Sequence, residues 1–360
     1  MKRRIFIIIC LFLSGLQAFS QNVYSASSPE ITYIGRVFRE GPVVKADWSG
    51  TAVAIRFQGK SLSLDYHETA LDDLNVWVDS EPGVEADAVV ELKAGDGRLE
   101  LCSFKKKGEH TVFIQKRTEG ENGCITFLSF VTDGVLLEAR GWKERVIEVV
   151  GDSYTCGYGV EAPDRDSPAI PSQENCNKSY SGILGRFFDA DIVRISHSGR
   201  GIARNYGDGD PGRTMPVRYT GVFDEEQGPE WTPDYTPDIV VVYLGTNDFS
   251  VGKQPSLGSW CASYKTLLQE IRAFHGADVP ILCVASNADS MLASYVKTAV
   301  EQSGDPNVHW TAIFTGAHNI TTDLGAAWHP NHQGMRKVAS LMAPYIATLT
   351  GWELPYKAMD

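Results

Sequence analysis

The apolar residues of this chain follow two different periods, and the change between them near Trp142 divides the chain into two parts. Before it, short segments alternate apolar with polar residues, a period of two that predicts strands with one buried face. After it, nearly continuous apolar segments alternate with helix-like stretches, which predicts a parallel sheet covered on both faces. A length of 360 residues agrees with two domains.

The N-terminal part, residues 21–143, predicts a β-sandwich. Its clearest strands are residues 52–57, 61–66, 75–79 and 111–115, separated by turns rich in Gly, Pro and Asp. The C-terminal part, residues 144–360, predicts an α/β domain. The expected strands are residues 145–150, 192–195, 238–244, 281–285 and 308–312, and the expected helices are residues 180–188, 257–274, 291–302 and 333–349. Because the join near Gly141 is short, we expect the two domains to pack against each other.

Residues 1–20 have the three parts of a signal peptide. Basic residues 2–4 precede the apolar run 5–13, and Ala18-Phe19-Ser20 forms a cleavage site before Gln21. The apolar run is shorter than the ~20 residues that span a bilayer, so we expect an exported protein, periplasmic or secreted, with no membrane anchor after cleavage. The formal net charge of −12 becomes more negative when the basic leader is removed, and it disfavours nucleic acid as a partner.

Export also affects the interpretation of the cysteines, of which one lies in the leader and six beyond it. An oxidising compartment permits disulfides, and the spacing leaves Cys102–Cys124 and Cys156–Cys176 open as pairings. Cys261 and Cys283 lie in apolar segments and are expected as buried free thiols. No C-x-x-C spacing occurs, and no set of His and Asp residues has familiar ligand spacing, so we expect no metal site.

Four of the expected strands are followed by residues that acyl transfer requires. Ser153 follows the first strand, Gly199 the second, Asn247 the third, and His329 lies in the loop after the fifth. The carboxyl ends of parallel strands meet at one edge of the sheet, where ligands of such folds bind. A serine hydroxyl becomes a nucleophile when a neighbouring histidine takes its proton, and fixed N–H donors stabilise the oxyanion that forms. The sequence therefore predicts Ser153 as nucleophile, His329 as general base, an oxyanion hole of Ser153 N–H, Gly199 N–H and the Asn247 amide, and no cofactor.

These blocks, in this order, resemble those of the SGNH/GDSL hydrolases: Gly151-Asp-Ser-Tyr154, Ser198-Gly199, Gly245-Thr-Asn-Asp248 and His329-Pro330. The longer strings 151–159 and 198–201, together with Gly35-Arg36 and Trp48-Ser-Gly50, resemble carbohydrate esterase family two, the acetyl xylan esterase type. The resemblance covers nearly the whole mature chain. It implies a jelly-roll β-sandwich followed by a three-layer α/β/α SGNH domain. It also implies a serine esterase that removes O-acetyl groups from acetylated xylan, glucomannan or related sugars through an acyl-enzyme.

One position departs from the SGNH pattern. Ala326 stands three residues before His329, where these enzymes commonly carry an Asp. The resemblance to family two implies a Ser–His dyad in which a backbone carbonyl orients the imidazole. Asp323 is the alternative acid. The missing acid also motivates a rival interpretation, a glycan-binding protein without catalytic activity.

The sequence leaves several further roles open. Asp152 and Ser153 are residue types that also cap helices, and Asp248 is expected to be structural. His197 is a second candidate for a role in the site. Trp328, Tyr154, Tyr158 and Trp231 are candidate platforms for a sugar ring, although the same residue types fill cores. A lipid, thioester or peptidoglycan esterase on the same fold remains an alternative, and the preferred sugar, the acetyl position and the oligomeric state are not determined by the sequence.

Overall fold

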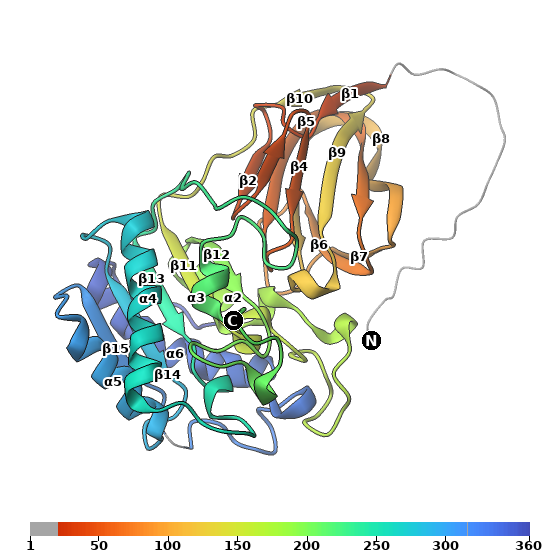
Figure 1. Ribbon diagram of the computed structural model, residues 1–360. Coiled ribbons are helices and arrows are strands. Elements are labelled where there is room, and N and C mark those ends of the chain that lie inside the picture. The colour runs from red at the N-terminus through yellow and green to blue at the C-terminus, as the bar shows by residue number, and fades with distance from the viewer. Residues whose placement is uncertain (1–20, 315) are drawn as a thin grey trace.

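The computed structural model describes residues 21–314 and 316–360 and consists of two domains in contact with each other (Figure 1). The expected signal peptide, residues 1–20, lies outside the described residues. Within the part of the chain that the structure describes, no helix is both long enough and apolar enough to cross a membrane.

The N-terminal domain is one ten-stranded antiparallel sheet that curls around an apolar core. Its strands are β1 (Asn22–Ser25), β2 (Thr32–Ile34), β3 (Phe38–Glu40), β4 (Val43–Ala46), β5 (Ala52–Glu68), β6 (Asp72–Val78), β7 (Ala88–Leu92), β8 (Gly95–Lys116), β9 (Ile125–Thr132) and β10 (Val135–Leu137). The expected β-sandwich is thus confirmed as an antiparallel β domain, and its two halves form one continuous curled sheet because the long strands β5 and β8 run through both.

The bend in β5 explains why the sequence predicts two strands, 52–57 and 61–66, where the structure has one. The pairing of β5 with β8 shifts register between Gly59 and Ser61 and again between Leu62 and Ser63. Such bulges bend a strand and increase its twist. The first part of β5 pairs with β2 and β10 and the last part with β9, so the bend carries the strand from one half of the sheet to the other.

The C-terminal domain is a five-stranded parallel sheet between two layers of helices, as the apolar strand pattern predicts. The strands are β11 (Val146–Gly151), β12 (Asp191–Ser196), β13 (Ile239–Tyr243), β14 (Ile281–Ala285) and β15 (Val308–Ala312), in the order β12-β11-β13-β14-β15. Helices α2 (Tyr180–Phe188) and α6 (His332–Thr350) cover one face. Helices α3 (Met215–Tyr219), α4 (Leu257–His275) and α5 (Met291–Ser303) cover the other. The strand order reverses at β11, because β12 and β13 lie on opposite sides of it, and a crevice forms beyond the carboxyl end of such a strand.

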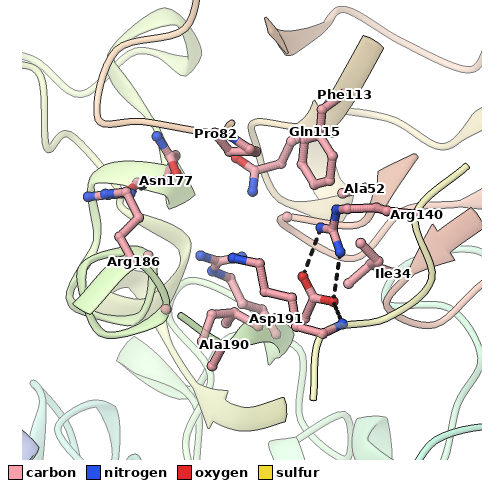
Figure 2. A pocket seen from close by; sticks show the side chains of 16 residues that line it. Ile34, Ala52, Pro82, Phe113, Gln115, Arg140, Asn177, Arg186, Ala190 and Asp191 are labelled. Atoms are coloured by element: carbon pink, nitrogen blue, oxygen red, sulfur yellow. Dashed lines mark hydrogen bonds and ion pairs between the residues drawn. The ribbon is translucent and has the colours of Figure 1, made fainter. Parts of the chain in front are cut away.

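The two domains meet through buried polar contacts. At their junction a small cavity of about 60 Å³ lies between Phe113 and Gln115 of the N-terminal domain and Asn177 and Arg186 of the C-terminal domain (Figure 2). Beside it, Arg140 of the connecting segment pairs with Asp191 through hydrogen bonds of 3.0 and 3.2 Å. The expected packing of one domain on the other is therefore realised by specific pairs.

The six cysteines of the described chain are all free thiols, so the disulfides that the spacing permits are not formed. Cys156 Sγ lies 3.4 Å from Ser196 Oγ, whereas Cys176 Sγ lies 3.4 Å from the Lys116 carbonyl. The two thiols of that pairing thus have different partners and do not bond to each other. Cys261 and Cys283 are buried thiols, as expected.

Candidate active site

Ser153 lies at the point where the strand order reverses. It is the first residue of α1 (Ser153–Cys156), which begins directly after β11. The Asp152 side chain caps this helix by accepting a hydrogen bond from the Tyr154 N–H at 3.2 Å. A side chain at Gly151 would place its Cβ 1.9 Å from Thr155 Oγ1, so the tight turn requires glycine there. The capping role therefore belongs to Asp152, and Ser153 is free to present its hydroxyl.

The structure brings Ser153 and His329 into direct contact. Ser153 Oγ lies 2.8 Å from His329 Nε2, although the two residues are 176 positions apart. His329 lies in the loop that precedes α6, which places it at the same sheet edge as the end of β11. The arrangement fits a serine that gives its proton to an imidazole.

A backbone carbonyl orients the imidazole of His329. Its Nδ1 lies 3.0 Å from the Ala327 oxygen, which fixes the proton on Nδ1 and leaves Nε2 as the acceptor for Ser153. Ala327 and Trp328 have positive φ values of 50° and 64°, a conformation that L residues seldom adopt. The turn that aims this carbonyl at the ring is therefore held against an intrinsic backbone preference.

Asp323, the alternative acid, does not reach His329. Its carboxylate accepts hydrogen bonds from the Asn319 N–H at 2.6 Å and the Thr322 hydroxyl at 3.0 Å, and it pairs with Lys337. The Asp323 hypothesis is therefore wrong, because this carboxylate is occupied inside its own loop.

Burial lowers the pKa of His329 below the ordinary histidine value. The carbonyls of Ala327 and Ala326 and the charge of Glu119 act in the opposite direction, but burial outweighs them. The pKa of Asp152, the residue before Ser153, is shifted the other way: burial, followed by the charges of Asp248 and Glu119, raises it to about 7. The histidine is therefore neutral, and able to accept a proton, at neutral pH.

Two of the three expected oxyanion residues, Gly199 and Asn247, lie on loops that touch each other. The Asn247 Nδ2 donates to the Arg200 carbonyl at 2.8 Å and to Asp152 Oδ2 at 3.2 Å, so it joins the turn after β12 to the residue beside Ser153. Gly199 sits in that turn with φ +74°, and a Cβ there would approach only Tyr206, at 3.7 Å. Glycine is thus needed for its backbone conformation and not because space is short. Donation by Asn247 to an oxyanion requires one of its two hydrogen bonds to be shared or exchanged.

The aromatic candidates separate into two groups. Trp328 is 54% exposed beside His329, and the Tyr158 ring centroid lies 5.0 Å from that of His329. Tyr154 also packs edge-on against His329, at 5.5 Å. Trp231 is only 4% exposed and packs in a separate apolar cluster with Val222 and Phe223, so its interpretation as a sugar platform is wrong and its core interpretation is correct.

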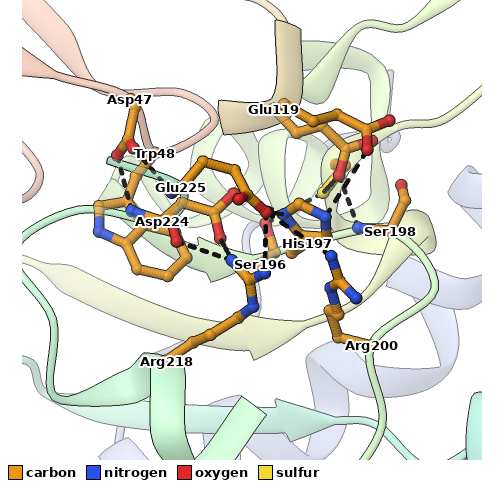
Figure 3. A network of polar contacts seen from close by, with 12 residues as sticks. Asp47, Trp48, Glu119, Ser196, His197, Ser198, Arg200, Arg218, Asp224 and Glu225 are labelled. Carbon is orange, nitrogen blue, oxygen red and sulfur yellow. Dashed lines mark hydrogen bonds and ion pairs between the residues drawn. The ribbon is translucent and has the colours of Figure 1, made fainter. Parts of the chain in front are cut away.

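His197 is buried beneath the turn that carries Gly199 and does not line the site. The ring is 1% exposed, and its Nδ1 lies 2.7 Å from Asp224 Oδ2 (Figure 3). His197, Asp224 and Glu225 have the spacing of metal ligands. However, Arg218 binds Asp224 Oδ1 at 2.7 Å and Glu225 Oε1 at 2.8 Å, so a guanidinium already supplies the positive charge that these carboxylates require.

Two other assignments follow from hydrogen bonds. Asp248 accepts from the backbone N–H groups of residues 202, 203 and 204 at 2.7–3.1 Å, which confirms its structural role. His332 is the first residue of α6, and its Nδ1 lies 3.1 Å from the Lys178 carbonyl, away from Ser153. Sequence reasoning did not find Glu119, which reaches this site from the N-terminal domain and has no motif around it.

Comparisons with known proteins agree with this geometry. Residues 33–139 match the family described as carbohydrate esterase 2 N-terminal, and residues 149–337 match the GDSL-like lipase/acylhydrolase family. The cellulase/esterase CelE of Acetivibrio thermocellus is 31% identical over 336 residues, which are 90% of this chain and 40% of that relative. The chain thus spans less than half the length of CelE.

Two further relatives match over nearly their whole length. The acetylxylan esterase / glucomannan deacetylase of Cellvibrio japonicus is 26% identical over 357 residues, covering 92% of this chain and 95% of that protein. A solved family two carbohydrate esterase from Clostridium thermocellum, in complex with cellohexaose, is 30% identical with a TM-score of 0.81, covering 90% of this chain and 100% of that one.

Proposed function

The chain belongs to the GDSL-like acylhydrolases and, through its N-terminal domain, to carbohydrate esterase family 2, and on this basis we propose that it removes O-acetyl groups from plant-type polysaccharides such as acetylated xylan or glucomannan. The observation that carries the proposal is the 2.8 Å contact between Ser153 Oγ and His329 Nε2, with the Ala327 carbonyl on the other ring nitrogen. A hydroxyl and an imidazole in this relation form a Ser–His dyad for ester hydrolysis.

The reaction proceeds in two halves. His329 Nε2 takes the hydroxyl proton as Ser153 Oγ attacks the acetyl carbonyl, and the negative charge develops on the carbonyl oxygen. The N–H groups of Ser153 and Gly199 and the amide of Asn247 stabilise this oxyanion. His329 then gives the proton to the departing sugar hydroxyl. Water attacks the acetyl-enzyme by the same route, and acetate leaves. No step needs a cofactor.

The absence of a carboxylate at position 326 has a mechanistic consequence. The Ala327 carbonyl selects the useful tautomer of His329, but a dipole stabilises the imidazolium that forms less than a full negative charge does. A dyad of this kind therefore relies more heavily on its oxyanion donors.

The surroundings of the dyad favour a carbohydrate substrate. Trp328 exposes about half of its surface beside the base, and an indole face is a suitable platform for a sugar ring. The net charge of −12 suits a neutral polymer better than an anionic membrane or a nucleic acid. The leader at residues 1–20 supports export to the periplasm or the medium, where such polymers are reached.

The substrate class is tested with a panel of acyl esters. Acetate release from acetylated xylan and acetylated glucomannan is measured beside hydrolysis of p-nitrophenyl esters from acetate to laurate. We expect kcat/KM to fall by at least about tenfold between the acetyl and octanoyl esters, because each poorly accommodated methylene costs on the order of 1 kcal/mol. A preference for long chains would favour the lipid-esterase alternative and contradict the proposal.

The pH dependence follows from the lowered pKa of His329. The base must be neutral, so kcat/KM is expected to rise with pH and to level off with an apparent pKa below 6.5, the ordinary value for histidine. Steady-state rates between pH 4 and 8 measure this limb. Asp152, whose pKa is about 7, titrates beside Ser153, and the Asp152→Asn variant separates its contribution. An apparent pKa above 6.5 in both proteins would contradict the carbonyl-oriented dyad, since it would require a nearby negative charge.

A further inference from the structure

The N-terminal domain places a buried carboxylate against the turn that carries Gly199. Glu119 follows β8 and is 0% exposed. Its Oε2 accepts a hydrogen bond from the Ser198 N–H at 2.5 Å and lies 3.6 Å from Cys156 Sγ, in the short helix that Ser153 begins. Glu119 lies close to Ser198 in the polar network around His197 (Figure 3). One side chain of the first domain therefore contacts two of the active-site segments of the second.

Glu119 is itself held rigidly. Its backbone N–H donates to Glu174 Oε1 at 2.7 Å, and its carbonyl accepts from Lys116 Nζ at 3.1 Å. Lys116 also pairs with Asp72 at 2.6 Å, and all of these side chains are buried. Two hydrogen bonds thus hold the Glu119 backbone in place, and the carboxylate extends from it to Ser198.

Burying the Glu119 carboxylate at this position lowers the stability of the fold. The second oxygen, Oε1, is buried without a hydrogen-bond partner among the described residues, and an unpaired buried acceptor costs free energy. Burial and the charge of Glu119 also raise the pKa of Glu174 well above its ordinary value. A structural contact between domains could be made without either penalty, which points to a role in the site.

Because the Ser198 N–H is bound to Glu119, the His197–Ser198 peptide is held in one orientation, directly before the peptide that carries the Gly199 N–H. We propose that Glu119 is a positioning residue of the active site, which fixes the turn at residues 197–199 so that the Gly199 N–H is aimed at the oxyanion. This inference rests on the proposed esterase function. On this proposal, the N-terminal domain contributes a residue on which the geometry of the catalytic site depends.

A second contact from the same domain holds the other side of this turn. Asp47 accepts the backbone N–H of Asp224 at 2.7 Å, and Asp224 binds the His197 ring. The turn is thus held by Glu119 directly and by Asp47 through Asp224. Two buried carboxylates of one domain therefore set the geometry of a catalytic turn in the other.

Two substitutions separate the reach of Glu119 from its charge. Glu119→Gln keeps an oxygen at the same distance from the Ser198 N–H and removes the charge. Glu119→Asp keeps the charge but is one methylene too short to reach. With p-nitrophenyl acetate, we expect kcat to fall by about 10- to 100-fold in Glu119→Asp with KM nearly unchanged, because the oxyanion donor acts in the transition state. In Glu119→Gln we expect kcat within about threefold of wild type.

An inhibitor provides a readout that a purely structural role would not move. Phenylboronic acid forms a tetrahedral adduct with the serine, so its Ki in Glu119→Asp is expected to rise by a factor similar to the loss in kcat. A fluorophosphonate that labels Ser153 counts the folded sites, and all rates are expressed per labelled site. Glu109→Asp serves as the control, because Glu109 is an exposed residue of β8 that pairs with Arg56, and it is expected to match wild type.

Three outcomes would overturn the inference: a Gln variant as slow as the Asp variant, an Asp variant equal to wild type, or an Asp variant with fewer labelled sites but unchanged kcat and Ki per site. Failure of the proposed function is recognised separately. In that case wild type itself releases no acetate, or Ser153→Ala hydrolyses the ester as fast as wild type.

Discussion

Replacing Ser153 with alanine is expected to lower kcat for acetate release from acetylated xylan by about 10⁴- to 10⁶-fold, the range seen when a hydrolase loses its nucleophile. The variant removes one oxygen atom and leaves the Asp152 cap of α1 in place, so its stability should change by less than about 1 kcal/mol. Polysaccharide binding should be retained, since no other contact is altered. Acetate is measured by an enzyme-coupled assay, and binding by calorimetry.

A double variant tests whether the two residues act as one unit. Because the hydroxyl and the imidazole act in the same proton transfer, Ser153→Ala/His329→Ala should be no slower than Ser153→Ala alone. Ser259→Ala provides the control, because Ser259 is exposed in the first turn of α4 and its hydroxyl donates to the Ser256 carbonyl at 3.0 Å, within that turn. Equal acetate release by wild type and Ser153→Ala would favour the glycan-binding alternative without catalysis.

The dyad could be predicted from the sequence because its residues follow strands of a regular parallel sheet. Strands β14 and β15 have the bounds that the apolar pattern predicts, 281–285 and 308–312. Once the strands of a parallel sheet are known, residues that follow them must gather at one edge. Ser153 and His329 were therefore expected to meet, and the structure places them 2.8 Å apart.

The groups that hold the active-site residues in position could not be predicted in the same way. Glu119 and Asp47 lie in loops of the N-terminal domain, and no periodicity encodes how one domain docks on another. The carbonyl of Ala327 has no side-chain signature, so the residues themselves indicated only that an acid was missing at position 326, and the orienting carbonyl was implied by the resemblance to family two alone. Trp231 remained ambiguous because indole rings serve cores and sugar platforms equally well.

The largest effect on stability is expected at Arg36, a buried residue of the N-terminal domain whose side chain contacts the C-terminal domain. The side chain is 0% exposed; its guanidinium carbon lies 4.1 Å from the Trp231 ring centroid, and its Nη2 lies 3.7 Å from Glu148 Oε2. Glu148 belongs to β11, the strand that ends beside Ser153, and it also accepts from the Tyr219 hydroxyl at 2.7 Å. Burial by itself raises the pKa of Glu148, but the hydrogen bond of His275 and the charge of Arg36 outweigh it and lower the pKa to about 2.

Arg36→Met should therefore lower the free energy of unfolding by about 3–5 kcal/mol, because it leaves the buried charge of Glu148 without its cation. The first transition in urea, followed by tryptophan fluorescence, measures this loss, and Arg39→Met, in an exposed residue of β3, is the matched control.

The double variant Arg36→Met/Glu148→Met should lose less free energy of unfolding than Arg36→Met alone, since a buried apolar pair leaves no charge without a partner. The lowered pKa of Glu148 in the native state stabilises the fold at pH values above about 4.3, the pKa of Glu in the unfolded chain. This stabilisation is lost as the pH falls from about 4.3 toward 2. The difference in the free energy of unfolding between wild type and Arg36→Met should therefore shrink over that pH interval. A double variant less stable than Arg36→Met would show that Glu148 is held by His275 and the tyrosines and does not depend on Arg36.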